Sequence, residues 1–206
     1  MSNFDEIIPL GKTCNITFLL QNCNVKKYTT LFEWFVTKNL NNITNVLVKI
    51  GNNTDDNDII KVCNDHNHIY IEDSNIFTSH YTIEEFTPIY KRRRDRLVDC
   101  IKNNNKILFI RYECDNNEIS NKDIDDFQNA IKNINPNNDN MKLLIISKND
   151  LNLNHPFLLN EIYNDIENDS YCEGEKINSF FINTLQKVGY NITNISTISF
   201  NDKSII

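Results

Sequence analysis

Three short, almost continuous apolar runs constrain the fold more than any other feature of this sequence. They are Asp5–Leu10, Lys106–Tyr112 and Leu143–Ser147. A strand with one solvated face alternates apolar and polar residues, whereas a nearly unbroken apolar run is typical of a strand covered on both faces. Amphipathic helix patterns lie between these runs, at Phe86–Lys102 and Ile119–Ile134. Strands that alternate with helices predict a parallel sheet in which the three runs are neighbouring strands.

We therefore predict an α/β fold: a single three-layer domain with a mostly parallel, Rossmann-like sheet. The chain has 206 residues, a length that suits one domain. We predict that 1–206 is that domain, either alone or as the N-terminal part of a longer protein. Further predicted elements are a strand at Ile69–Glu72, a helix at Glu175–Val188 with Gly189 as its C-cap, and a last strand at Ile195–Phe200.

Charge and hydropathy argue against several classes of function. A net charge of -7 and a pI near 5.1 give no general attraction to nucleic acid or to an anionic membrane. The sequence has no run of about 18 apolar residues, and its first residues lack the basic and apolar regions of a signal peptide. The sequence therefore predicts a cytoplasmic protein that binds neither nucleic acid nor membrane, and it leaves the oligomeric state open.

Metal binding is not expected. The six cysteines are scattered and include no Cys-x-x-Cys pair, so reduced thiols are the default. Cys63, His66 and His68 are spaced like half of a zinc site, but no matching second half follows. We therefore expect no metal cofactor.

Cys14 is the strongest candidate for chemistry. It follows the first predicted strand and the turn at Gly11, Lys12 and Thr13, and it opens a helix. Ligands of parallel sheets gather at the carboxyl ends of the strands, where this turn is predicted. A helix N-terminus lowers the pKa of a thiol, and its N–H groups can hold an oxyanion during acyl transfer. The alternative is a small buried residue that packs a tight turn.

His80 and Glu33 are candidates for proton transfer and orientation. His80 is predicted in a loop before the long helix, where a histidine can act as general base for a thiol. The alternative for His80 is a surface or capping residue. Glu33 lies inside the aromatic run Leu31–Phe35. A half-buried carboxylate there would orient a histidine or bind a substrate amine, and the alternative is an exposed helix position.

The helix predicted at Phe86–Lys102 carries a dense basic run that we expect to face outward. Its arginines are Arg92, Arg93, Arg94 and Arg96. Arginines recognise phosphate through forked hydrogen bonds. In an acidic protein such a local run favours an anionic ligand. The alternative is a solvated face paired with neighbouring aspartates.

Five segments, taken in order, resemble the motifs of a family of unknown function that carries the label papain-like cysteine peptidase. The family pattern is Leu-Gly-x-x-Cys opening a helix, Pro-Phe-Asp-Trp, a His before an aromatic residue, Tyr-x-Arg-Arg-x-x-Arg, and a strand with Leu-Phe-x-Arg. The corresponding segments here are Leu10–Cys14, Leu31–Trp34, His80–Tyr81, Tyr90–Arg96 and Leu108–Arg111. The second segment departs from the pattern, with Leu31 in place of the proline and Glu33 in place of the aspartate.

The family label implies Cys14 as nucleophile and His80 as base. The arrangement is also similar to coenzyme-A-binding enzymes of capsular polysaccharide synthesis, α/β proteins with a comparable early cysteine that are thought to acetylate sugars. Relatives in large DNA viruses are associated with amino-sugar acetylation for surface glycans, so a viral chain would act in the host cytoplasm. The second resemblance accounts for the arginine run, because coenzyme A and nucleotide sugars carry phosphates and a peptide carries none.

We therefore expect an acetyl-CoA-dependent N-acetyltransferase that acts on an amino sugar, in nucleotide-linked form, during glycan synthesis. The alternatives are a papain-like cysteine hydrolase that uses Cys14 and His80, and a non-catalytic module that binds a phosphorylated ligand. The expected catalytic residues are Cys14, His80 and Glu33, and the expected contacts to coenzyme A are Gly11, Lys12, Thr13, Arg92, Arg93, Arg96 and Arg111.

Overall fold

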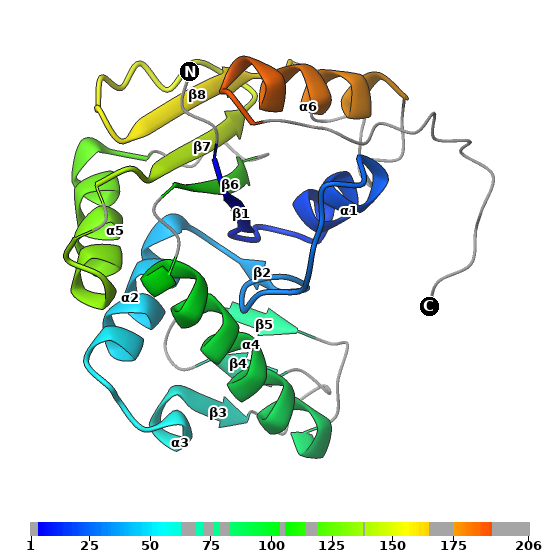
Figure 1. The fold of residues 1–206 in the computed structure, drawn as a ribbon. Coiled ribbons are helices and arrows are strands. Elements are labelled where there is room, and N and C mark those ends of the chain that lie inside the picture. Colours follow the sequence, from blue (N-terminus) through cyan, green and yellow to red (C-terminus); the bar gives the residue numbers. More distant parts are fainter. Residues whose placement is uncertain are drawn as a thin grey trace.

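The computed structural model describes residues 4–62, 69–71, 76–78, 83–103, 106–113, 119–137, 139–164 and 175–190. Its frame is a four-stranded parallel sheet with the strand order β1-β6-β7-β8 (Figure 1). These strands are β1 (Glu6–Pro9), β6 (Ile107–Glu113), β7 (Lys142–Ser147) and β8 (Leu158–Ile162). The three apolar runs of the sequence are therefore neighbouring parallel strands, as predicted.

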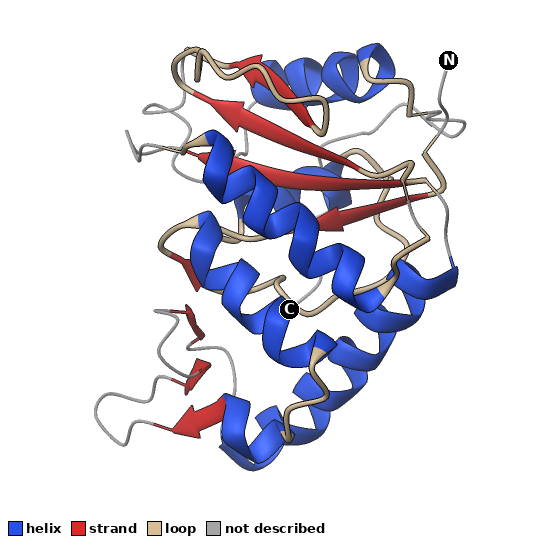
Figure 2. Ribbon diagram, turned by 90° about the vertical axis from the view of Figure 1, so that its left-hand side faces the viewer, coloured by secondary structure: helices blue, strands red, loops and turns tan. Residues whose placement is uncertain are grey.

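Helices cover both faces of the sheet and give the predicted three-layer α/β fold (Figures 1 and 2). One face carries α1 (Asn15–Asn22) and α6 (Glu175–Lys187), and the other carries α2 (Leu40–Gly51), α4 (Ile83–Asn103) and α5 (Asn121–Ile134). Successive side chains of a strand point to opposite faces. Because both faces are covered, every position of β6 is buried.

The two hydrophobic cores divide the side chains of β6 between them. Leu108 and Ile110 pack with α1 and α6, whereas Ile107 and Phe109 pack with α2, α4 and α5. The Phe109 ring meets the Phe127 ring of α5 edge to face, with centroids 5.4 Å apart. The unbroken apolar run is therefore the direct consequence of a strand shared by two cores.

A second, smaller sheet was not expected from the sequence. It is antiparallel, has the order β2-β5-β4-β3, and lies in the lower part of Figure 1 near α4. The strand expected at Ile69–Glu72 exists, but it belongs to this sheet. The elements of this region are β2 (Val36–Thr37), α3 (Asp56–Ile59), β3 (Ile60–Val62), β4 (Ile69–Ile71) and β5 (Ile76–Thr78).

The parallel connection from β7 to β8 contains no helix. Leu151 and Leu153 of this segment pack against the core that includes α5. His155 fastens it further, because its Nε2 lies 3.0 Å from Asp125 Oδ1 and its Nδ1 accepts a hydrogen bond from Phe157 N at 3.1 Å. A short segment can close this crossover because its own side chains replace the apolar face of a helix.

The helices predicted near Ile119–Ile134 and Glu175–Val188 are confirmed as α5 and α6. Gly189 follows α6 with a φ of 89°, and its N–H donates to Gln186 O at 3.0 Å, which fits the predicted C-cap. The strand predicted at Ile195–Phe200 lies outside the described residues. Within the described part of the chain, no helix is long and apolar enough to cross a bilayer.

Candidate active site at the carboxyl edge of the sheet

The turn that leads from β1 to α1 lies at the carboxyl edge of the parallel sheet. Gly11 adopts a φ of 62°, and a Cβ there would lie 2.9 Å from Phe32 O and 3.1 Å from Phe35 O. Both the backbone conformation and the space therefore require glycine. Thr37 N donates to Lys12 O at 3.2 Å, so the turn is also hydrogen-bonded to β2.

Cys14 is the N-cap residue of α1, and its thiol is half-buried. Its side chain makes no capping hydrogen bond to the helix, and Asn15 N donates to Thr13 Oγ1 at 3.3 Å. Burial raises the pKa of the Cys14 thiol, and a hydrogen bond from its own backbone N–H opposes this shift only in part. The predicted lowering of this pKa is therefore wrong, because the loss of hydration outweighs the favourable helix terminus. The raised pKa favours the protonated thiol over the thiolate.

A buried network of hydrogen bonds and ion pairs stabilises the Gly11 turn. Arg111 is fully buried, and its guanidinium donates to Gly11 O at 3.0 Å and to Thr37 Oγ1 at 2.7 Å. It also forms an ion pair with Glu113, which Lys12 Nζ approaches to 3.4 Å. Lys12 and Arg111, both predicted as ligand contacts, thus hold the Gly11 turn in place. Their direct partners here are backbone oxygens and neighbouring side chains.

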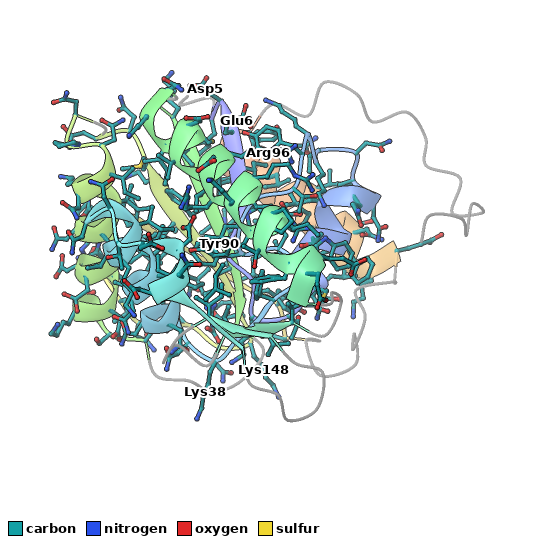
Figure 3. The ribbon with its side chains drawn as sticks, turned by 90° about the horizontal axis from the view of Figure 1, so that it is seen from below. Asp5, Glu6, Lys38, Tyr90, Arg96 and Lys148 are labelled. Carbon is teal, nitrogen blue, oxygen red and sulfur yellow. The ribbon has the colours of Figure 1, made fainter. Side chains whose placement is uncertain are left out.

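The carboxyl edge of the sheet also carries exposed and half-exposed cations. Lys38 is exposed and Lys148 is half-buried, and both lie at the same end of the molecule, opposite Asp5 and Glu6 (Figure 3). Lys12 Nζ donates to Lys38 O at 3.0 Å, which places Lys38 next to the Cys14 turn. Two lysine side chains therefore lie at the edge where parallel sheets bind their ligands.

Two further helices begin at this edge. Asn39 caps α2 through a reciprocal capping box with Asn42, and Ser120 caps α5 in the same way with Asp123. Asn41 Nδ2 donates to Asp123 Oδ1 at 2.7 Å and joins the two first turns. The partial positive charge at the start of α5 is offset by the Asp123 carboxylate, whereas the first turn of α2 has no acidic residue and adds to the positive charge of Lys38.

Glu33 is buried and belongs to a turn between α1 and β2, with no helix around it. Its carboxylate accepts hydrogen bonds from Thr30 N at 2.6 Å and Thr30 Oγ1 at 3.2 Å, and it lies 2.6 Å from Lys26 Nζ. The alternative for Glu33, an exposed helix position, is therefore wrong. The Glu33 carboxylate does bind an amine, but this amine is the side chain of Lys26 and not a substrate.

The arginine run does not form one outward-facing patch, contrary to prediction. Arg93 is buried and its Nη1 donates to Glu33 O at 3.4 Å, while Arg94 forms ion pairs with Asp56 and Asp95. Successive helix residues are separated by about 100°, so adjacent arginines point to different sides.

Arg92 and Arg96 are exposed on α4. Arg96 donates to Thr29 O at 3.4 Å and lies at the end of the molecule that holds Asp5 and Glu6 (Figure 3). Arg96 is thus far from Lys38 and Lys148, which lie at the other end of the molecule.

His80 lies outside the described residues, so its pairing with Cys14 stays a prediction. Cys63, His66 and His68 also lie outside the described part. Within the described part, no group of three or more His, Cys, Asp or Glu residues is arranged to hold a metal ion.

Sequence reasoning missed an aromatic pair beside Cys14. Phe18 lies one turn into α1 and is 36% exposed, and its ring meets that of Trp34 edge to face at a centroid distance of 5.3 Å. Trp34 is half-buried, and Lys26 Nζ lies 5.6 Å from its ring centroid. The sequence feature that could have indicated this pair is the single tryptophan of the chain, Trp34, which directly follows the candidate residue Glu33.

A cavity of about 760 Å³ lies away from this edge. It is enclosed by α3, α4 and the last turns of α2 and α5. Asp56 and Arg94 form an ion pair in its wall, and Lys91 and Asn133 also line it. Its charges are of both signs, and it does not include Cys14.

Comparisons with known proteins add no relative. A scan against protein-family models, a search of curated proteins and a search of solved structures each find no match to this chain.

Proposed function

We propose that this chain is an acetyl-CoA-dependent N-acetyltransferase that acts on an amino sugar in nucleotide-linked form. The observation that carries the proposal is the position of Cys14. It is a half-buried thiol on a glycine turn at the carboxyl edge of a parallel sheet, beside Lys12 and Lys38. Edges of this kind are where α/β proteins bind phosphate-bearing ligands.

The reaction forms a bond between the acetyl carbonyl carbon and the acceptor nitrogen, and it breaks the carbon–sulfur bond of the thioester. The sulfur of coenzyme A leaves as a thiol, and the acceptor amine gives up a proton to a base. The N–H groups at the start of α1 are suited to stabilise the oxyanion that forms between these steps. His80 is the base that the sequence predicts.

The raised pKa of Cys14 bears on its role. A neutral thiol suits the wall of a thioester pocket, because it adds no charge next to the sulfur of the substrate. It becomes a nucleophile only if a base removes its proton during the reaction. We therefore propose that Cys14 lines the thioester site and that no thiolate is preformed.

Phosphate binding is assigned to Lys38 and Lys148. Both lie at one end of the molecule and Arg96 lies toward the other (Figure 3), and the hydrogen bond from Lys12 Nζ to Lys38 O links Lys38 to the Cys14 turn. Replacing each lysine by alanine should raise KM for acetyl-CoA about tenfold, the usual effect of one charge-assisted contact. The matched control is Lys102→Ala, which removes an exposed lysine in the last turn of α4.

The experiment is a thermal-shift titration with coenzyme A, followed by an assay of thiol release from acetyl-CoA with a UDP-linked amino sugar. We expect coenzyme A to raise Tm and thiol release to require the sugar. We expect Cys14→Ala to keep partial activity and mass spectrometry to find no acetyl adduct. The proposal fails if coenzyme A leaves Tm unchanged while a peptide epoxide modifies Cys14 and peptide substrates are cleaved, which is the pattern of the hydrolase alternative.

A further inference from the structure

We infer that Trp34 and Phe18 form the surface that binds the ring face of the acceptor sugar beside Cys14. The inference names the substrate contact of the proposed site, so the identity of the acceptor rests on the proposed function. Its physical basis is independent of that function. It comes from a strained backbone, from the contacts that impose the strain, and from a partly exposed aromatic pair.

The first observation is the backbone conformation of Trp34. Its φ is 67°, in the left-handed region that large side chains rarely adopt. This conformation is unfavourable for a residue other than glycine, because its Cβ approaches the following carbonyl oxygen. Such strain persists only where the surroundings impose it, and it concentrates at functional sites.

Four contacts hold the segment that carries Trp34 in this conformation. Phe32 O and Phe35 O, on either side of Trp34, pack directly onto Gly11. The neighbouring Glu33 is held through its carboxylate by Lys26 and through its carbonyl oxygen by Arg93. Gly11, Glu33 and Arg93 were all candidates for chemistry, yet each acts on the segment that carries Trp34. We therefore regard them as positioning residues for this ring.

The resulting surface lies next to the candidate thiol. Phe18 N donates to Cys14 O at 3.1 Å, so the two residues are one helical turn apart on the same face of α1. Helical side chains lean toward the N-terminus of the helix, which brings the Phe18 ring toward Cys14. Phe18 and Trp34 are in edge-to-face contact, and both remain partly exposed.

A pyranose ring fits this surface because its C–H face is flat and apolar while its hydroxyl groups point outward. Adenine is also flat, and it is the rival occupant. In coenzyme A, however, the adenine lies at the far end of the molecule from the thioester. The acceptor amine must instead reach the thioester carbon, so its ring must bind at the reaction centre. A ring-binding surface beside Cys14 is therefore assigned to the acceptor.

The chain offers a direct readout, because Trp34 is its one tryptophan. Tryptophan emission should be followed during separate titrations with UDP-glucosamine, UDP and coenzyme A. We expect a saturable change in intensity or wavelength with UDP-glucosamine and none with UDP or coenzyme A. An equal change with UDP or with coenzyme A would assign the surface to a nucleobase and overturn the inference, as would no change with any of the three.

Phe18→Ala provides the second test, since an exposed side chain can be removed without unfolding the protein. We expect calorimetry to show roughly tenfold weaker binding of UDP-glucosamine and unchanged binding of coenzyme A. Val48→Ala removes a similarly exposed apolar residue from α2 and should change neither affinity. Equal losses in the two variants would overturn the inference.

The two proposals fail separately. A sugar-specific change in emission in a protein that releases no thiol from acetyl-CoA would overturn the transferase function and leave the ring-binding surface standing. Acetyl transfer that proceeds with unaltered KM for the sugar in Phe18→Ala would overturn the surface and leave the function standing.

Discussion

At the residue scale, Cys14 experiences two opposing influences. The start of α1 favours the thiolate, whereas partial burial removes the water that would solvate it, and burial has the larger effect on the pKa. A sequence reveals the first influence, because a strand, a glycine turn and a helix pattern can be recognised. It does not reveal how much of a side chain neighbouring segments cover.

The labelling of cysteines by iodoacetamide tests this balance. Cys14 is half-buried, while Cys23 is buried and its pKa is raised to about 11. We expect Cys14 to react first of these two, slowly at pH 7, with a rate that keeps rising with pH beyond the ordinary thiol range of about 8.5. Peptide mass spectrometry after timed quenching measures both rates. A Cys14 rate already at its plateau at pH 7 would contradict the raised pKa.

Gly11 provides a test of the turn. Gly11→Ala must place a side chain in the left-handed region and against two backbone oxygens, so we expect a loss of roughly 2 kcal/mol or more of stability in urea unfolding. The control is Gly51→Ala at the end of α2. There an added Cβ would lie 2.6 Å from Asn133 Nδ2, a side-chain end that can move away. Equal losses in the two variants would show that the Gly11 turn is not specially constrained.

At the element scale, the length of the apolar pattern decides what a sequence can predict. β6 and β7 are found because they contain seven and five consecutive buried residues, respectively. β2 has only two residues and β8 is half-exposed, so the apolar pattern of neither strand differs from that of a loop sequence. The basic run of α4 is evident in the sequence, but the sequence does not show which of its arginines is buried. In the structure Arg93 is buried against the segment that carries Trp34, whereas its neighbours Arg92 and Arg96 are exposed.

The site was predicted in the same uneven way. Gly11, Lys12 and Cys14 do lie together at the carboxyl edge of the sheet. The role of Glu33 was missed, because its partner Lys26 is distant from any motif and only the folded turn brings them within 2.6 Å. Positive φ at Trp34 has no sequence signal of its own.

Asn39 gives a prediction about α2. Asn39→Ala removes the hydrogen bond that the Asn39 side chain accepts from Asn42 N, so we expect a loss of about 1 kcal/mol of stability. Asn45→Ala, on the exposed face of the same helix, should instead raise stability by a few tenths of a kcal/mol through higher helix propensity. Urea unfolding of both variants measures the difference. A loss in Asn45→Ala equal to that in Asn39→Ala would contradict the capping role.

At the scale of the whole molecule, burial makes the fold sensitive to alkali. Burial raises the pKa of the Tyr28 and Tyr90 hydroxyls and of the Cys23 thiol. Each group is neutral below its unfolded pKa, where folding carries no penalty from it. As the pH rises from that value through the raised folded pKa, the unfolded state ionises first and stability falls.

We therefore expect the urea midpoint to fall between pH 8.5 and pH 11, values that bracket the ordinary pKa of about 8.5 for cysteine and about 10 for tyrosine. Tyr90→Phe should reduce this fall, and it should not lower stability at pH 7, because the Tyr90 hydroxyl has no hydrogen-bond partner among the described residues. A steeper fall in this variant would contradict the assignment.

The register of β1 has a consequence for the time course of synthesis. Glu6 pairs with Ile107, and Arg111 of the same later strand closes the Gly11 turn. A ribosome adds about 5–20 residues per second, so roughly 5–20 seconds separate the emergence of β1 from that of its partner. During that interval the strand before Cys14 is exposed without its neighbour, and the Gly11 turn cannot form its hydrogen bond to Arg111 until that later strand has been made.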